Sequence, residues 1–172
     1  MNYLYVFCVL FSLVSCKAKS SLNSAVVSHL EQTVCPENGV CAYQIIENKA
    51  LNVKTDNLGS VYLEMTDSDN FVVKFEYKKN SSGKHQDSEY REEVFIELNK
   101  NKLDFETTNL KFKKLFFARW CYCKGQTGYY KINEGKLSVT TIDKNSYKLH
   151  FEFTIPEVPQ IINEINYTFS LQ

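Results

Sequence analysis

Four cysteines are the residues of this chain best suited to chemistry. Cys121 and Cys123 lie two positions apart in the stretch RWCYCKGQTGYY, and Cys35 and Cys41 enclose the short loop CPENGVC. Four thiolates could together bind zinc, and a Cys-x-Cys pair could bind copper or exchange electrons. The same four residues could instead form two disulfides.

The spacing of these cysteines favours disulfides over a metal. Structural zinc sites place two to four residues between paired cysteines, whereas the two gaps here are five residues and one residue. If the chain is exported, an even number of cysteines also indicates disulfides, because the periplasm and the cell exterior are oxidising. We therefore expect no bound metal and no cofactor. A metal-binding or thiol-redox protein that uses the Cys121-x-Cys123 strand is the alternative.

The pairing of the four cysteines stays open, because three pairings exist. The loop CPENGVC, with Pro and Asn-Gly at its tip, suits a local bridge from Cys35 to Cys41. In an extended strand Cys121 and Cys123 point to the same face with Cβ atoms about 6–7 Å apart, whereas a disulfide needs about 4 Å. A crossed pairing between the first loop and this strand would avoid that strain.

The sequence contains no motif for catalysis. None of His29, His85 and His150 is near a nucleophile motif, and no pair of them has metal-ligand spacing, so we expect all three at the surface. Five acidic residues lack the order of a calcium loop and are predicted to form a solvated edge. They are Asp87, Glu89, Glu92, Glu93 and Glu97. We therefore expect a protein that is not an enzyme.

The balance of charge excludes nucleic acid as the main partner. Twenty basic residues balance twenty acidic ones, and 18 of the basic residues are lysine, whereas phosphate and base recognition favours the guanidinium fork of arginine. Four basic residues gather in KFKKLFFAR, residues 111–119. They could lie against anionic lipid or an acidic partner, although the pattern predicts an ordinary strand with one basic face.

Alternation of apolar and polar residues predicts strands over most of the chain after residue 40. In NFVVKFEYKK the apolar face is Phe71, Val73, Phe75 and Tyr77. In SYKLHFEFTI we expect Phe151 and Phe153 in the core, with Lys148 and His150 facing solvent. Shorter runs around residues 61–65, 94–98, 137–141 and 165–171 have the same period of two.

Polar turn signals separate these runs: TDSDN, NSSGK, NKNK, NEGK and DKNS. KGQTG is predicted to be a hairpin turn in which Gly125 and Gly128 supply positive φ angles. The fold class that follows is all-β, an antiparallel meander that forms a barrel or a sandwich of about 8–10 strands. A short helix near the mature N-terminus is expected in SAVVSHLEQTV, residues 24–34.

The N-terminus is predicted to be an export signal. Residues 4–14 contain no charge, proline or glycine, and a run of this length suits a signal peptide and is too short to span a bilayer. The run ends in LVSC, residues 13–16, which resembles the lipobox of bacterial lipoproteins. The resemblance implies that Leu13, Val14 and Ser15 are recognised, that the chain is cut before Cys16, and that Cys16 is acylated. Cleavage after Ala18, as in plain secretion, is the alternative.

The expected organisation has three parts: a signal peptide (1–15), a lipidated tether (16–24) and a single β-rich domain (25–172). Lys17 stands where the family's inner-membrane proteins have Asp, so the resemblance implies sorting to the outer membrane. We expect a non-enzymatic binding or structural module, held on the bilayer by acylated Cys16. Its other partner would be a protein, a glycan or a small apolar ligand.

Overall fold

The computed structural model describes residues 33–81 and 89–171. These residues form nine strands in two antiparallel sheets, and none of them is helical. The described part therefore also holds no helix that could cross a membrane. The prediction of an all-β fold is confirmed, and the architecture is the sandwich. Most of the predicted helix at residues 24–34 lies outside the described residues, and Thr33 and Val34 are irregular.

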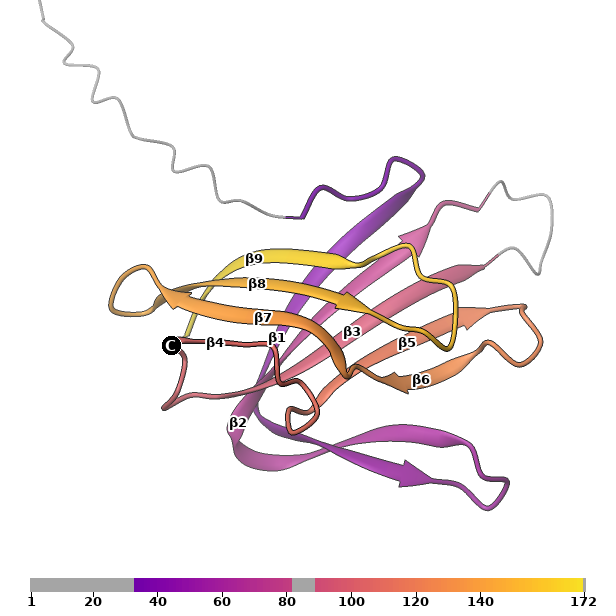
Figure 1. Ribbon diagram of the computed structural model, residues 1–172, viewed down its shortest axis with the longest axis horizontal. Coiled ribbons are helices and arrows are strands. Elements are labelled where there is room, and N and C mark those ends of the chain that lie inside the picture. Colours follow the sequence, from indigo (N-terminus) through magenta and orange to yellow (C-terminus); the bar gives the residue numbers. More distant parts are fainter. Residues whose placement is uncertain (1–32, 82–88, 172) are drawn as a thin grey trace, which may run out of the picture.

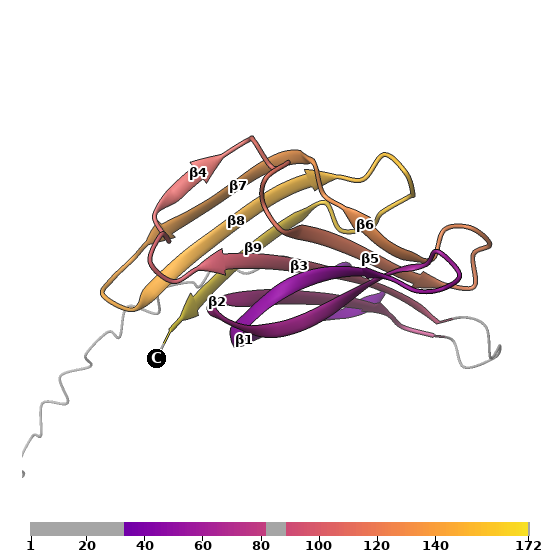
Figure 2. The same cartoon turned by 90° about the horizontal axis from the view of Figure 1, so that it is seen from below.

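The first sheet has five strands in the order β1-β2-β3-β5-β6. Their bounds are β1 Gly39–Thr55, β2 Val61–Lys79, β3 Tyr90–Asn99, β5 Leu115–Cys121 and β6 Gly128–Lys131. The second sheet has four strands in the order β4-β7-β8-β9. Their bounds are β4 Phe105–Thr107, β7 Glu134–Thr141, β8 Ser146–Thr154 and β9 Glu164–Ser170. The two sheets face each other as two layers (Figure 1 and Figure 2).

The chain follows a meander with one excursion. Hairpins join β1 to β2, β2 to β3, β5 to β6, β7 to β8, and β8 to β9. Between β3 and β5 the chain crosses to the second sheet, where β4 pairs with β7, and then returns to pair beside β3.

The main core fills the space between the sheets, as the alternation predicts. Phe71, Val73 and Phe75 of β2 are fully buried there, and Leu149, Phe151 and Phe153 of β8 face them from the second sheet. The predicted register of β8 is correct: Lys148 and His150 lie half-buried on the opposite face.

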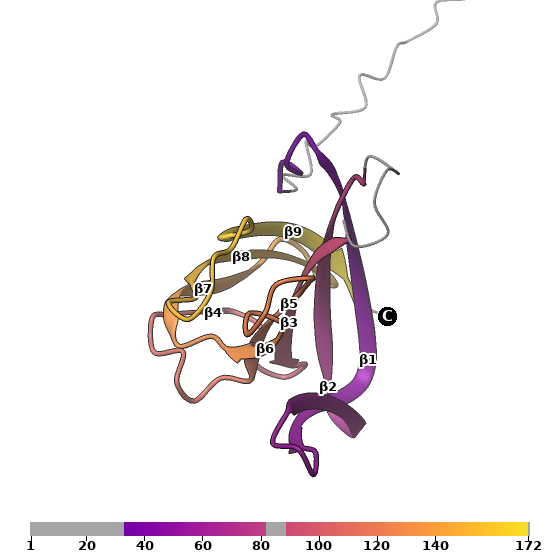
Figure 3. The ribbon, with the colours of Figure 1, turned by 90° about the vertical axis from the view of Figure 1, so that its right-hand side faces the viewer.

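A second, smaller core lies on the outer face of the first sheet. The ladder between β1 and β2 shifts register between Glu47 and Lys49, where Asn48 has a φ of 57°. Beyond this bulge the end of the hairpin bends away from the rest of the sheet (Figure 3) and buries Leu51 in the cluster that contains Phe95 and Phe116. We call this end of the hairpin, residues 49–67, the arm.

The predicted turn at TDSDN is wrong, because residues 66–70 continue β2. Pairing with β1 keeps Thr66 and Asp67 extended, and Asn70 pairs with Asn99 of β3. Lys49 Nζ lies 2.6 Å from Asp67 Oδ1, and Asn52 Nδ2 donates to Thr66 Oγ1 at 2.8 Å. Cross-strand pairs of this kind outweigh a local preference for turns.

Candidate functional site

The disulfide between Cys35 and Cys41 has its Cα atoms 5.7 Å apart and closes the loop that precedes the body of β1. Cys121 and Cys123 are also bonded to each other, with Cα atoms 5.2 Å apart. They were expected in a continuous strand, but β5 ends at Cys121 and the chain turns at Tyr122.

The strand order explains why a crossed pairing does not form. Cys41 lies on β1 and Cys121 lies at the end of β5, with β2 and β3 between them. At a spacing of about 4.8 Å per strand, the two residues lie roughly 14 Å apart, beyond the reach of a disulfide. Each bridge therefore stays within one local segment.

Beside the second bridge, three side chains form a row across the outer face of the first sheet. Lys78 of β2 pairs in register with Arg91 of β3, and Arg91 pairs with Trp120 of β5. This row borders a surface hollow of about 370 Å³ that we call the Trp120 pocket. Its lining consists of Lys78, Glu89, Tyr90, Arg91, Trp120, Cys121, Tyr122 and Thr127.

Trp120 is fixed from two sides. Its indole Nε1 donates a hydrogen bond to Glu93 Oε2 at 2.5 Å, and its ring meets Tyr129 edge-on with centroids 5.2 Å apart. The Arg91 guanidinium lies 5.8 Å from the centroid of the same ring, a cation–π arrangement. The indole is therefore held in one orientation before any ligand binds.

Glu93 is the electrostatic centre of this face. Its side chain is only 6% exposed, and Lys74 Nζ lies 2.6 Å away, while Arg91 lies at the longer distance of 3.8 Å. Burial alone would raise the pKa of Glu93, but the hydrogen bonds from Lys74 and Trp120 outweigh burial and the pKa is lowered. Glu93 therefore stays ionised at neutral pH and accepts hydrogen bonds from both Lys74 and Trp120.

Arg91 is less completely paired than its neighbours. The distance to Glu93 is long for an ion pair, and within the described part of the chain the buried Nε atom has no hydrogen-bond partner. Lys78 lies 3.9 Å from Glu89, and both of these side chains are mostly exposed. The two cations of the pocket thus retain capacity for an anionic ligand.

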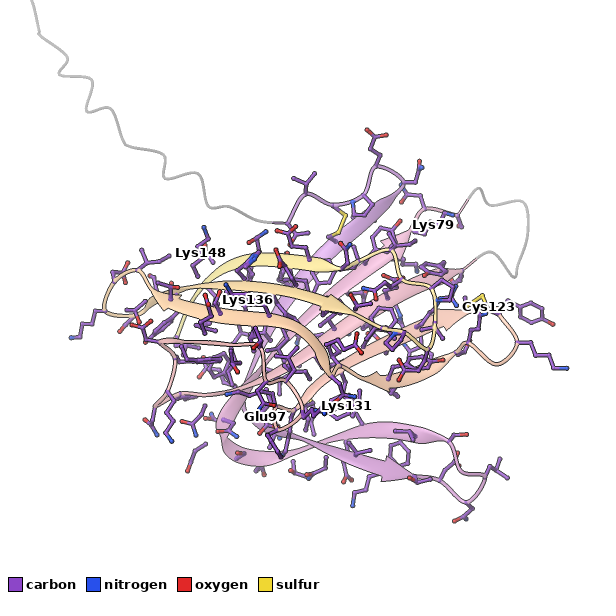
Figure 4. All side chains as sticks on the ribbon, in the orientation of Figure 1. Lys79, Glu97, Cys123, Lys131, Lys136 and Lys148 are labelled. Carbon is purple, nitrogen blue, oxygen red and sulfur yellow. A yellow bond between two sulfur atoms is a disulfide. The ribbon has the colours of Figure 1, made fainter. Side chains whose placement is uncertain are left out.

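Tyr122 gives the pocket an exposed aromatic wall, with 84% of its surface accessible. It sits between the two bonded cysteines at the start of the β5–β6 loop, and Cys123 lies at the outer end of the molecule (Figure 4). Thr127 Oγ1 donates to the Cys121 carbonyl at 2.8 Å and closes this loop. The predicted turn is confirmed, since Gly125 and Gly128 have φ angles of 72° and 136°.

A buried polar network supports the same loop from the inner face of the sheet. Glu92 is fully buried. Its carboxylate accepts a hydrogen bond from the Tyr90 hydroxyl, and it accepts hydrogen bonds from the backbone N–H groups of Ile161 and Ile162 at 2.7 and 2.8 Å. Burial, with the hydrogen bond to Glu92, raises the pKa of Tyr90 to about 12.

Arg119 extends this network into the β5–β6 loop. Its Nε donates to the Tyr90 hydroxyl at 3.2 Å, and its guanidinium donates to Gln126 Oε1 at 2.5 Å.

The solvated acidic edge predicted from the sequence is wrong for Glu92, Glu93 and Glu97, whose side chains are buried or nearly so.

One further group on the second sheet could ligate a metal. The ligating atoms of His150, Glu152 and Glu164 lie within 4.8 Å of one another. Asn166 Oδ1 lies 2.8 Å from His150 Nδ1, and Asn166 Nδ2 donates to Glu164 at 2.7 Å. Both carboxylates are about half exposed, so the group is a solvated polar network.

Cys16, His29, His85 and Asp87 lie outside the described residues. The sequence analysis singled out the stretch around Cys121 but did not predict that Lys78 and Arg91 lie beside it.

No family model, curated protein or solved structure matches the chain.

Proposed function

We propose that the protein is a lipid-anchored, non-enzymatic binding module of the cell envelope, and that it takes an acidic saccharide in the Trp120 pocket. The observation that carries the ligand class is the row of Lys78, Arg91 and Trp120 beside the exposed ring of Tyr122. The anchor would be acylated Cys16, and the residues LVSC support that assignment. The outer membrane is the proposed location, with plain secretion as the alternative.

The residue types of the pocket match the two parts of such a ligand. The C–H faces of a sugar ring pack on aromatic faces, and Trp120 and Tyr122 offer two of them. A carboxylate on the sugar would accept hydrogen bonds from the guanidinium of Arg91 and the ammonium of Lys78. A small apolar ligand is less suited, because the space between the sheets is packed with side chains.

Trp120 makes the proposal directly testable, because it is the single tryptophan of the chain. Its fluorescence would be followed while the protein is titrated with oligosaccharides that contain uronic acids. Neutral glucose oligosaccharides of the same length are the matched control. We expect a saturable change with the acidic series, and a response of equal affinity to the neutral series would refute the ligand class.

Two substitutions separate pocket binding from general charge attraction. Lys78→Ala should weaken binding roughly fivefold, and Arg91→Ala at least about tenfold, because each removes a cation of the pocket. Lys79→Ala is the matched control, since Lys79 follows Lys78 in β2 and its side chain lies on the opposite side of the strand. If Lys79→Ala had the same effect as Lys78→Ala, the ligand would not be in the Trp120 pocket.

The alternative function, a metal-binding or thiol-redox protein, needs free thiols at Cys121 and Cys123. The bond between these cysteines works against it. Free thiols would be counted in the mature protein under denaturing, non-reducing conditions, together with bound zinc and copper. Two free thiols or a stoichiometric metal would favour the alternative.

A further inference from the structure

The loop between β4 and β5 exposes a phenylalanine among lysines. Phe112 has 88% of its surface accessible, and its neighbours in the chain are Lys111, Lys113 and Lys114. The sequence predicted a strand with one basic face here, but β5 begins only at Leu115 and the lysines before it lie in the loop. We call residues 110–114 the Phe112 loop.

The Phe112 loop is anchored at both ends. Leu110 is fully buried in the main core, and its carbonyl accepts the Lys113 N–H at 3.0 Å. Lys131 Nζ donates to the Lys113 carbonyl, and the Lys113 ammonium lies 4.3 Å from the ring centroid of Phe105. The tight backbone turn therefore directs Phe112 outward, and its exposure is a property of the folded loop.

Positive charge is concentrated at this loop although the whole chain is neutral. Lys111, Lys113, Lys114 and Lys131 lie in or against it, and Lys114 is paired with Glu97 at 3.3 Å. Figure 4 labels Lys131 and Glu97 near the base of the arm. Burial lowers the pKa of Lys131, and the neighbouring Lys114 lowers it further, as expected where cations are crowded.

We propose that the Phe112 loop docks on an anionic lipid bilayer. Phe112 would enter the boundary between the headgroups and the acyl chains, while the lysines contact lipid phosphates. A single aromatic ring at a loop tip, surrounded by lysines on long stems, suits a fluid interface, because lysine stems adapt while the ammonium groups stay in the headgroup layer. Anionic headgroups attract each such lysine. Docking does not require acylated Cys16, but in a lipid-anchored chain it would set how the domain faces the membrane.

Fluorescence quenching by brominated lipid tests this docking. The full chain, as isolated, is prepared with Phe112→Trp, and its N-terminus is determined by mass spectrometry. The matched control is Leu58→Trp at the tip of the arm, where the native side chain is 92% exposed. Trp120 is present in both proteins. With vesicles of brominated phosphatidylcholine and one third phosphatidylglycerol, we expect quenching and a blue shift for Phe112→Trp only.

A charge reversal tests the part played by the lysines. In the Phe112→Trp protein, Lys111→Glu should lower the equilibrium constant for docking roughly 25-fold, since each charge near an anionic surface contributes about fivefold and the reversal changes the charge by two units. Lys144→Glu, at an exposed turn between β7 and β8, is the control and should change little.

Three results would overturn the proposal: no quenching of the Phe112→Trp protein, equal quenching of the Leu58→Trp protein, or equal effects of the two charge reversals. The first result would leave an acidic protein surface as the partner of the loop. If mass spectrometry found acylated Cys16 while docking failed, the anchor would stand and this inference alone would be wrong.

Discussion

The indole of Trp120 and the carboxylate of Glu93 are joined by a hydrogen bond of 2.5 Å, so the aromatic wall of the pocket depends on one nearly buried charge. Lys74 approaches the other oxygen of the same carboxylate at 2.6 Å. A buried charge with good partners is stable only while every partner remains. The orientation of the pocket is therefore linked to the ionisation of Glu93.

Acidic pH should weaken the support that ionised Glu93 gives to Trp120. The folded-state pKa of Glu93 lies below its ordinary value of 4.5. The contribution of ionised Glu93 to the free energy of unfolding is therefore fully present above pH 4.5, and it is lost as the pH falls through the lower folded-state pKa. Glu93→Gln should lower the free energy of unfolding at pH 7 by about 2 kcal/mol, because Lys74 loses a charged acceptor.

The Glu93 prediction is checked by urea unfolding between pH 7 and pH 3. The variant should lose less stability than the wild type over the acid range. Glu157→Gln, at an exposed position, is the matched control and should keep the wild-type slope. A Glu93→Gln protein with the wild-type slope would show that Glu93 is not the group that titrates.

A second prediction concerns the buried network behind the pocket. Glu92→Gln should cost roughly 2–3 kcal/mol of stability, because the amide places a donor against two backbone N–H groups that need an acceptor. Glu89→Gln, at a mostly exposed side chain, should leave the urea midpoint unchanged. Faster amide exchange at Ile161 and Ile162 in the Glu92→Gln protein would show that their tie to β3 is lost. Equal stability of the two variants would contradict the role of Glu92.

Strands and their inward faces could be predicted from the sequence because each depends on local alternation. Val94, Ile96 and Leu98 were assigned to one face and are buried together. Glu92 lies two residues before Val94, so the same alternation places its side chain on the face that points to the core. The prediction of a solvated edge gave more weight to the charge of Glu92 than to its position in the alternating pattern.

The candidate site could be predicted only in part, because register brings together residues that the chain separates. Trp120 is adjacent to Cys121 in the sequence, whereas Lys78 and Arg91 reach it through pairing across three strands. The arm was missed for the same reason, since its path depends on a bulge at Asn48 and on contacts of Leu51 with other strands.

The third prediction tests the register of β8. Phe153→Ala should destabilise the protein by ~3–5 kcal/mol, because it leaves a cavity next to Phe117 and Phe151. His150→Ala removes polar contacts on the half-buried outer face and should cost less than about 1 kcal/mol. Thermal unfolding of both variants at pH 7 measures the difference. Equal losses would indicate a register wrong by one residue.

The last prediction concerns Cys16. If LVSC is a lipobox, the mature protein begins at Cys16, partitions with membranes and incorporates labelled fatty acid. Acyl chains contribute ~0.8 kcal/mol per buried methylene, so two or three chains hold a protein on a bilayer firmly. Cys16→Ser should abolish labelling and leave an unprocessed or soluble protein. Its domain should keep the wild-type urea midpoint, because Cys16 precedes all nine strands of the described residues and is expected to lie in the tether. A mature N-terminus at Lys19, with all of the protein in the soluble fraction, would show plain secretion instead.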